Sequence, residues 1–140
     1  MINNDKTITK KEAALYSPLT LAYLGDAVFE LMVREKLVLR ENAPNGKLHR
    51  EAKGFVSAKA QSRFIRKILD KLTTEELHIY KRGRNANGVP PKNADPAEYS
   101  SATGLEALFG YLYLAGETAR MEFLFEEGIN DEKQNEKPDI

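Results

Sequence analysis

The stretch AYLGDAVFE, at residues 22–30, places an acidic residue inside an apolar run that extends over residues 19–33. A second apolar run, over residues 99–115, carries Glu106. Acidic side chains are rarely buried unless they are paired or bind a metal, and neither run contains Lys or Arg. If the two runs form helices that pack together, Asp26 and Glu106 meet in a place of low dielectric constant. They then need a cation, most simply Mg²⁺, which prefers oxygen ligands.

Length and composition limit what the chain can be. Its 140 residues fit one domain with a real core. There is no cysteine, which excludes disulfides and thiolate metal sites. The first six residues are polar and lack the apolar core of a signal peptide. The run at 19–33 is too short to span a membrane. We therefore expect a cytoplasmic protein with no membrane partner.

Charge is unevenly distributed, although the formal net charge is zero. Residues 34–92 hold fifteen Lys or Arg and six Asp or Glu, whereas residues 117–140 hold three and eight. A basic middle suits a polyanionic partner, because neutralising phosphates releases counterions. Charge alone supports equally well a set of solvated helix faces.

The sequence predicts an all-α fold, because no clean alternating strand pattern is present. The first helix should begin at Ser17-Pro18, an N-cap followed by proline at the first helical position, and apolar residues nearly encircle it, as in a central helix. Thr73 and Glu76 form a capping-box pattern. The predicted helices cover residues 18–39, 47–53, 55–69, 73–82, 99–115 and 118–127, with Gly116 and Gly128 closing the last two.

The chain should divide into three parts. We expect an N-terminal extension at residues 1–14, a helical domain at 15–128 and a disordered acidic tail at 129–140. Residues 83–97 are predicted to form a long loop, which in a compact domain is usually functional or disordered. The two apolar helices should approach closely through small residues on each, namely Ala22, Gly25, Ala27, Ala102, Gly104 and Ala107.

At these residues the chain resembles the ribonuclease III family, and most closely its Mini-III branch, which lacks a double-stranded-RNA-binding domain. The resemblance covers residues 15–128 in the same order. Its blocks are AYLGDAVFE (22–30), FVSAKAQ (55–61), KRGRNA (81–86), PKN (91–93) and EALFGYL (106–112). It implies the all-α ribonuclease III endonuclease-domain fold, assembled as a homodimer in which two active sites face a valley that holds duplex RNA.

The resemblance also implies a chemistry. Asp26 and Glu106 would be the catalytic residues and would hold Mg²⁺, which activates water to hydrolyse an RNA phosphodiester and leaves 5′-phosphate and 3′-hydroxyl ends. Full-length ribonuclease III places further acids where this chain has Ala22 and Thr103, and another near Pro44 or Asn45. Mini-III similarity implies maturation of both termini of 23S ribosomal RNA precursor. Whether a ribosomal protein helps to present the RNA is left open.

A set of basic and amide residues is predicted to bind duplex RNA through phosphates and 2′-hydroxyls. An ordinary basic loop is the competing interpretation. Glu30 could orient a metal ligand, but pairing with Arg34 at the i+4 spacing is slightly favoured. The predicted RNA-binding residues are His49, Lys59, Lys81, Arg82, Arg84, Asn85, Lys92 and Asn93.

Two other functions compete with the endoribonuclease. A non-catalytic scaffold that binds RNA or the ribosome would explain the missing carboxylates, yet a scaffold has no use for Asp26 and Glu106. A helical phosphohydrolase acting on nucleotides would need a denser set of His and Asp ligands than this chain offers.

Overall fold

The computed structural model describes residues 8–86 and 88–136, with side chains described as far as residue 129. Within these ranges the chain is helical and contains no strand, so the predicted all-α class is confirmed. None of the helices described is both long and apolar enough to cross a lipid bilayer. In chain order the elements are α1 (Lys10–Ala13), α2 (Pro18–Arg40), α3 (Asn45–Val56), α4 (Ala58–Ile68), the 3₁₀ turn η2 (Leu69–Lys71), α5 (Thr74–Arg84), α6 (Pro96–Leu114) and α7 (Thr118–Glu136).

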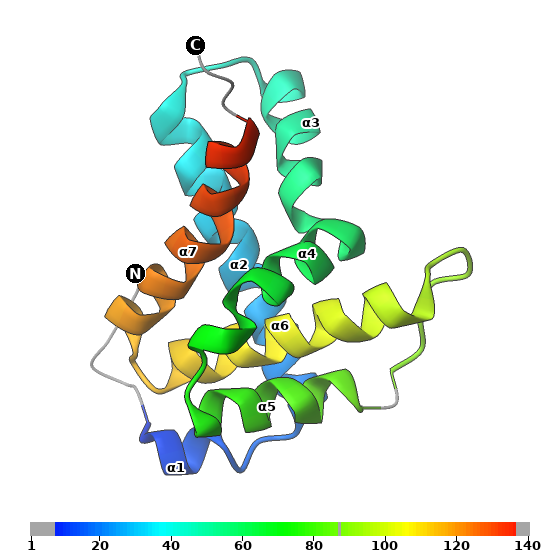
Figure 1. Ribbon diagram of the computed structural model, residues 1–140, viewed down its shortest axis with the longest axis vertical. Helices are drawn as coiled ribbons and strands as arrows, with labels where there is room; N and C mark the ends of the chain where they lie inside the picture. The colour runs from blue at the N-terminus through cyan, green and yellow to red at the C-terminus, as the bar shows by residue number, and fades with distance from the viewer. Residues whose placement is uncertain (1–7, 87, 137–140) are drawn as a thin grey trace.

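The two apolar runs form α2 and α6, which cross near the centre of the molecule (Figure 1). Glycine makes this crossing possible. A Cβ atom on Gly25 would lie 1.6 Å from the backbone oxygen of Glu106, and one on Gly110 would lie 2.0 Å from that of Leu21. The prediction that small residues let the helices approach closely is therefore confirmed at Gly25.

Helix α5 lies against another side of α6, opposite α4 in the view of Figure 1. Glycine again sets the distance between the helices. A Cβ atom on Gly104 would lie 2.6 Å from the Tyr80 ring, and one on Gly83 would lie 2.8 Å from the Cβ of Ala107. Helix α6 thus packs against α2, α4 and α5 and forms the centre of the fold.

Four phenylalanines, one from each of α2, α4, α6 and α7, fill the core between these helices. Phe29 is fully buried and meets the rings of Phe64, Phe109 and Phe125 edge to face, with centroids 5.1, 5.4 and 5.7 Å away. Such edge-to-face contacts are favoured by the ring quadrupole. The cluster fixes α7 against the three other helices.

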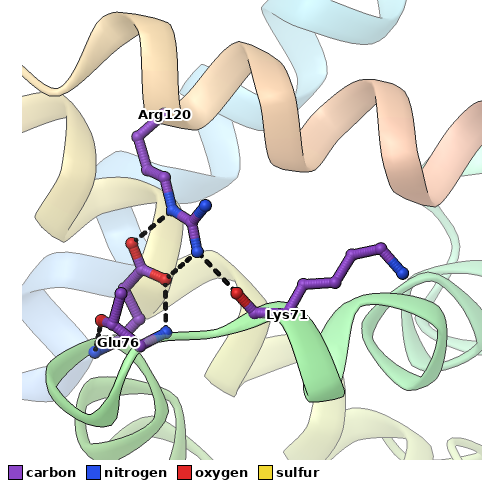
Figure 2. A network of polar contacts seen from close by, with 4 residues as sticks. Lys71, Glu76 and Arg120 are labelled. Carbon is purple, nitrogen blue, oxygen red and sulfur yellow. Dashed lines mark hydrogen bonds and ion pairs between the residues drawn. The ribbon is translucent and has the colours of Figure 1, made fainter.

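A partly buried ion pair ties the start of α5 to α7 (Figure 2). The Arg120 side chain donates to both carboxylate oxygens of Glu76, each at 2.8 Å, and to the backbone oxygen of Lys71 at 2.6 Å. Burial alone would raise the pKa of Glu76, but its hydrogen bonds to Arg120 and to the Thr73 backbone lower it. Glu76 also accepts from the Thr73 amide, which completes the predicted capping box.

Several predicted boundaries need correction in the first two-thirds of the chain. The helix predicted over 55–69 is interrupted at Ser57, whose extended backbone ends α3 and whose side chain caps α4 by accepting from the amide of Ala60. Within the predicted N-terminal extension, residues 1–7 lie outside the described part of the chain, whereas α1 packs on α6 and buries Ala13 completely. Ser17 occupies the N-cap position of α2 as predicted, but its side chain makes no capping hydrogen bond.

The end of the chain also differs from the prediction. Gly116 follows α6 with φ of 70°, as expected for a glycine that terminates a helix. Gly128, by contrast, lies inside α7, where a Cβ atom would lie 2.4 Å from the Phe64 ring. Residues 129–136, the first part of the tail predicted to be disordered, continue helix α7 in the structure. Residues 137–140 of that tail lie outside the described part of the chain.

Candidate active site

The α2–α6 crossing brings the two predicted catalytic acids together. Asp26 directly follows Gly25, and the backbone of Glu106 is the group that Gly25 contacts. Their side chains are hydrogen-bonded to each other. The close helix approach thus accounts for the position of both carboxyl groups, which come from parts of the chain eighty residues apart.

The predicted deep burial of both acids is wrong for Asp26 and holds only in part for Glu106. The Asp26 side chain is exposed, and Glu106 is half-buried. Helix α2 is not encircled by protein as predicted, because Leu19, Tyr23 and Leu31 are 42%, 86% and 45% exposed. An apolar composition therefore did not mean a buried helix here. The carboxyl pair opens to solvent, where a substrate can reach it.

Glu106 is electrostatically unusual. Burial, the charge of Asp26 and the hydrogen bond between the two acids together raise the pKa of Glu106 to about 8, while a hydrogen bond from Gln61 opposes the increase. Two carboxylates in contact cannot both ionise without cost. Without a metal, the pair therefore holds a proton near neutral pH, in the place where a cation would otherwise balance the charge.

The donor set suits a hard divalent cation. Among the described residues no group of three or more His, Cys, Asp or Glu could hold a metal. Ala22 and Thr103 stand at the two positions where the resemblance to full-length ribonuclease III would place further acids. Ala22 is buried, and the Thr103 hydroxyl donates to the Tyr99 carbonyl at 3.0 Å. Two carboxylates with water and substrate phosphate in the remaining positions are a usual environment for Mg²⁺. The residues present therefore fit Mg²⁺ bound by Asp26 and Glu106.

Sequence reasoning missed Gln61. This residue lies on α4, is 2% exposed and forms a hydrogen bond with the Glu106 side chain. The sequence did contain a sign of its role, because Gln61 falls on the same helix face as Phe64, Ile65 and Ile68, which are apolar and buried. A polar residue on an apolar face marks a group that needs a partner inside the protein.

Glu30, one turn beyond Asp26, has a partner on its own helix. Arg34 donates to its carboxylate through two nitrogens, at 2.6 and 2.9 Å. The interpretation that Glu30 pairs with Arg34 is therefore confirmed.

The predicted RNA-binding residues come from four parts of the fold. Lys81, Arg82, Arg84 and Asn85 lie at the end of α5, and Lys92 and Asn93 lie in the loop that leads to α6 (Figure 1). His49 is on α3 and Lys59 is in the first turn of α4. All are exposed except Arg82.

Arg82 is half-buried and already engaged within the protein. Its guanidinium donates to the backbone oxygens of Ala14 and Tyr16, at 2.7 and 2.9 Å, so it fixes the segment between α1 and α2. Arg84 lies two residues further along α5, with its guanidinium carbon 5.5 Å from the centroid of the Tyr80 ring. Among these cations, Lys81 and Arg84 are the ones on α5 whose side chains are exposed to a partner.

Comparison with known proteins agrees with this geometry. Residues 19–117 match the Ribonuclease III domain family. A "Mini-ribonuclease 3" of Thermoanaerobacter sp. is 44% identical over 89% of each chain, and one of Symbiobacterium thermophilum is 51% identical over 74% of this chain and 81% of its own. The crystal structure of a Fusobacterium nucleatum protein superposes with a TM-score of 0.76 at 36% identity, covering 83% of this chain and 95% of that one.

Proposed function

From the premise that this chain belongs to the ribonuclease III family, in its Mini-ribonuclease 3 branch, and is an endoribonuclease, we propose that it cuts double-stranded RNA with Mg²⁺ held by Asp26 and Glu106. The observation that carries the proposal is the pair of carboxyl groups that the α2–α6 crossing joins at a solvent-open position. Its cellular substrate is the 23S ribosomal RNA precursor in the cytoplasm, and a ribosomal protein that presents this RNA is compatible with the proposal.

The protein's own residues have defined tasks in this reaction. When bound, Mg²⁺ activates water and offsets the negative charge that grows on phosphate and leaving oxygen. Asp26 and Glu106 hold the cation, and Glu106 must give up its proton to do so, because its pKa of about 8 keeps it largely neutral below that pH. Exposed cations such as Lys81 and Arg84 bind the RNA backbone and place a phosphodiester at the carboxylates.

A second copy of the chain is the proposed occupant of the exposed apolar face of α2. Leu19, Tyr23, Ala27 and Leu31 follow one another at four-residue spacing and are exposed, so they form one stripe on the helix. A two-fold dimer uses the same patch on both chains. Because Asp26 borders this stripe, the pairing sets the two active sites beside the dimer axis, where each cuts one strand of a duplex.

The rival function is a scaffold that binds RNA without cutting it. A cleavage assay separates the two. A perfectly paired RNA and a single strand of the same sequence are incubated with the protein and Mg²⁺. The proposal expects cleavage of the duplex alone, with 5′-phosphate and 3′-hydroxyl ends, and no cleavage with chelator. Binding without cleavage supports the scaffold, and equal cutting of both RNAs contradicts duplex specificity.

The exposed cations of α5 should supply salt-sensitive affinity. The double variant Lys81→Ala/Arg84→Ala is expected to weaken duplex binding by about tenfold and to reduce the slope of log affinity against log salt by about 1 for each phosphate that the protein no longer neutralises. Binding is measured by fluorescence anisotropy over a salt series, in Ca²⁺ to prevent turnover. Arg82 is left intact, because its hydrogen bonds hold the α1–α2 segment.

The matched control for this double variant is Lys10→Ala/Lys11→Ala, which removes two exposed charges from α1. It should leave both affinity and slope close to those of the unmodified protein. Equal losses in the two double variants would mean that the α5 cations act through net charge alone. An unchanged affinity and slope in the α5 variant would remove these residues from the RNA path.

Without metal, Glu106→Gln should stabilise the protein at alkaline pH. Because the folded pKa of Glu106 lies above its unfolded value, the folded state binds the extra proton between about pH 4.5 and 8, and stability is lost as pH rises through this window. We expect the variant to gain about 1–3 kcal/mol at pH 8 and close to nothing at pH 4.5, after allowing for solvent screening of a half-buried site.

The measurement is urea unfolding in chelator at both pH values, with the exposed Glu35→Gln on α2 as control. Added Mg²⁺ should raise the stability of the unmodified protein and leave that of Glu106→Gln unchanged. A Glu106→Gln variant that is no more stable at pH 8 than at pH 4.5, relative to the unmodified protein, would contradict the charge account of the site.

A further inference from the structure

Gln61 carries a buried amide on the inner face of α4, and this amide is hydrogen-bonded to Glu106 of the carboxyl pair. The Gln61 side chain is 2% exposed, and its helix packs directly on α6, which carries Glu106. The neighbours on its face, Phe64, Ile65 and Ile68, are hydrophobic and buried. An amide in such a place costs free energy unless it is hydrogen-bonded.

The partner of this amide is the Glu106 carboxyl group, and the bond has a direction. A carboxylate oxygen can only accept a hydrogen bond, so the Gln61 N–H donates to Glu106. Gln61 therefore supports the Glu106 carboxylate from α4, a third helix beside the α2–α6 crossing.

Glu106 also needs an external support for its orientation. A glutamate side chain has several rotatable bonds and loses rotamer freedom when it is fixed. Asp26 is shorter and is placed by the glycine crossing itself. Gln61 is buried on a third helix and donates to one oxygen of Glu106. This hydrogen bond restricts rotation of the carboxylate and leaves its remaining lone pairs available to a cation shared with Asp26. If Gln61 served only to fill space, a methionine of similar volume could replace it at small cost.

We propose that Gln61 is a positioning residue, which holds the Glu106 carboxylate in the orientation that binds Mg²⁺ together with Asp26. This inference rests on the proposed function, because it assigns a support to the same site. Residues that hydrogen-bond a metal ligand commonly change metal affinity or activity by 10- to 100-fold when they are replaced. Gln61 contacts the ligand and needs no contact with RNA.

A spectroscopic test uses the unmodified protein. The chain contains only two glutamines, Gln61 and Gln134, so labelling with ¹⁵N-glutamine gives two side-chain amide signals, which a Gln134→Asn variant assigns. Mg²⁺ is then titrated into the RNA-free protein. The Gln61 amide signals should shift with the same midpoint as the Mg²⁺-induced rise in melting temperature. Gln61 signals that stay fixed while the melting temperature rises would overturn the proposal.

A substitution test separates positioning from packing. Gln61→Met keeps the volume and removes the donor, and Ser62→Ala is the matched control. Ser62 is a buried polar residue next to Gln61, whose hydroxyl accepts from Arg66 at 3.1 Å instead of contacting Glu106. For Gln61→Met we expect a Mg²⁺ Kd raised about tenfold by calorimetry and kcat lowered 10- to 100-fold, with KM for duplex RNA unchanged. Ser62→Ala should leave all three values unchanged.

The outcomes are distinguishable. If the unmodified protein neither binds Mg²⁺ nor cuts duplex RNA, the proposed function fails. If it does both and Gln61→Met matches it, the positioning role of Gln61 fails while the function stands. Circular dichroism checks that Gln61→Met is folded. If that variant does not fold, the titration of the unmodified protein decides the question.

Discussion

Asp26→Asn should abolish cleavage of duplex RNA, with a loss of at least about a thousandfold in kcat. The substitution keeps the size of the side chain and removes the negative charge that holds the cation, so transition-state charge is no longer offset. Glu106→Gln should behave alike, because the two carboxylates act on one ion. The measurement is single-turnover cleavage of a perfectly paired RNA at saturating protein and Mg²⁺.

The two variants should lose RNA cleavage but still dimerise and bind duplex RNA. Asp26 is exposed and is not part of the aromatic core, so light scattering should give twice the chain mass for Asp26→Asn and for the unmodified protein. Duplex affinity in Ca²⁺ should change by less than a factor of about three. Mg²⁺-dependent cutting by either variant at more than a few per cent of the normal rate would remove these carboxylates from the mechanism.

Gly25→Ala should prevent folding or cost more than about 4 kcal/mol, a loss of the size reserved for severe structural conflicts. The added Cβ atom would lie 1.6 Å from the Glu106 backbone oxygen and 2.8 Å from the Gly110 nitrogen. Both are backbone atoms of a buried helix, so no flexible side chain can move aside. The two central helices would have to separate, and the core would lose its close packing.

Gly54→Ala is the matched control for this substitution. Gly54 lies in α3, is exposed, and a Cβ atom there would have no heavy atom within 4 Å. The control should therefore stabilise the protein by about 0.5–1 kcal/mol through its better helix propensity. Urea unfolding followed by circular dichroism measures both. A Gly25→Ala protein that unfolds at the normal urea concentration would contradict the α2–α6 crossing.

The central helices and the carboxyl pair could be predicted from sequence, because local signals agreed with the tertiary structure. The apolar runs were long, and a glycine stood next to Asp26. The capping box of Thr73 and Glu76 is local and formed as predicted.

The features that the sequence did not predict correctly depend on contacts between distant parts of the chain. Gly128 resembles a helix stop, but it allows α7 to approach Phe64 sixty-four residues earlier. The four-residue helix α1 is anchored by a hydrogen bond from Ile8 to Leu114, at 3.0 Å, which sequence periodicity does not show. Arg82 appeared as one cation among several, and only the fold reveals its two backbone partners. The apolar composition of α2 likewise gave no indication that one side of the helix is exposed.

Asp26 and Glu106 are proposed to bind the catalytic cation jointly. Mn²⁺ accepts the same oxygen ligands as Mg²⁺ and can be located by anomalous X-ray scattering. The decisive measurement is therefore made on a crystal of the unmodified protein soaked in Mn²⁺. The account predicts an anomalous peak within about 2.0–2.4 Å of a carboxylate oxygen of both Asp26 and Glu106. A peak that contacts neither residue, or no peak between them in a protein that cuts duplex RNA with Mn²⁺, would contradict it.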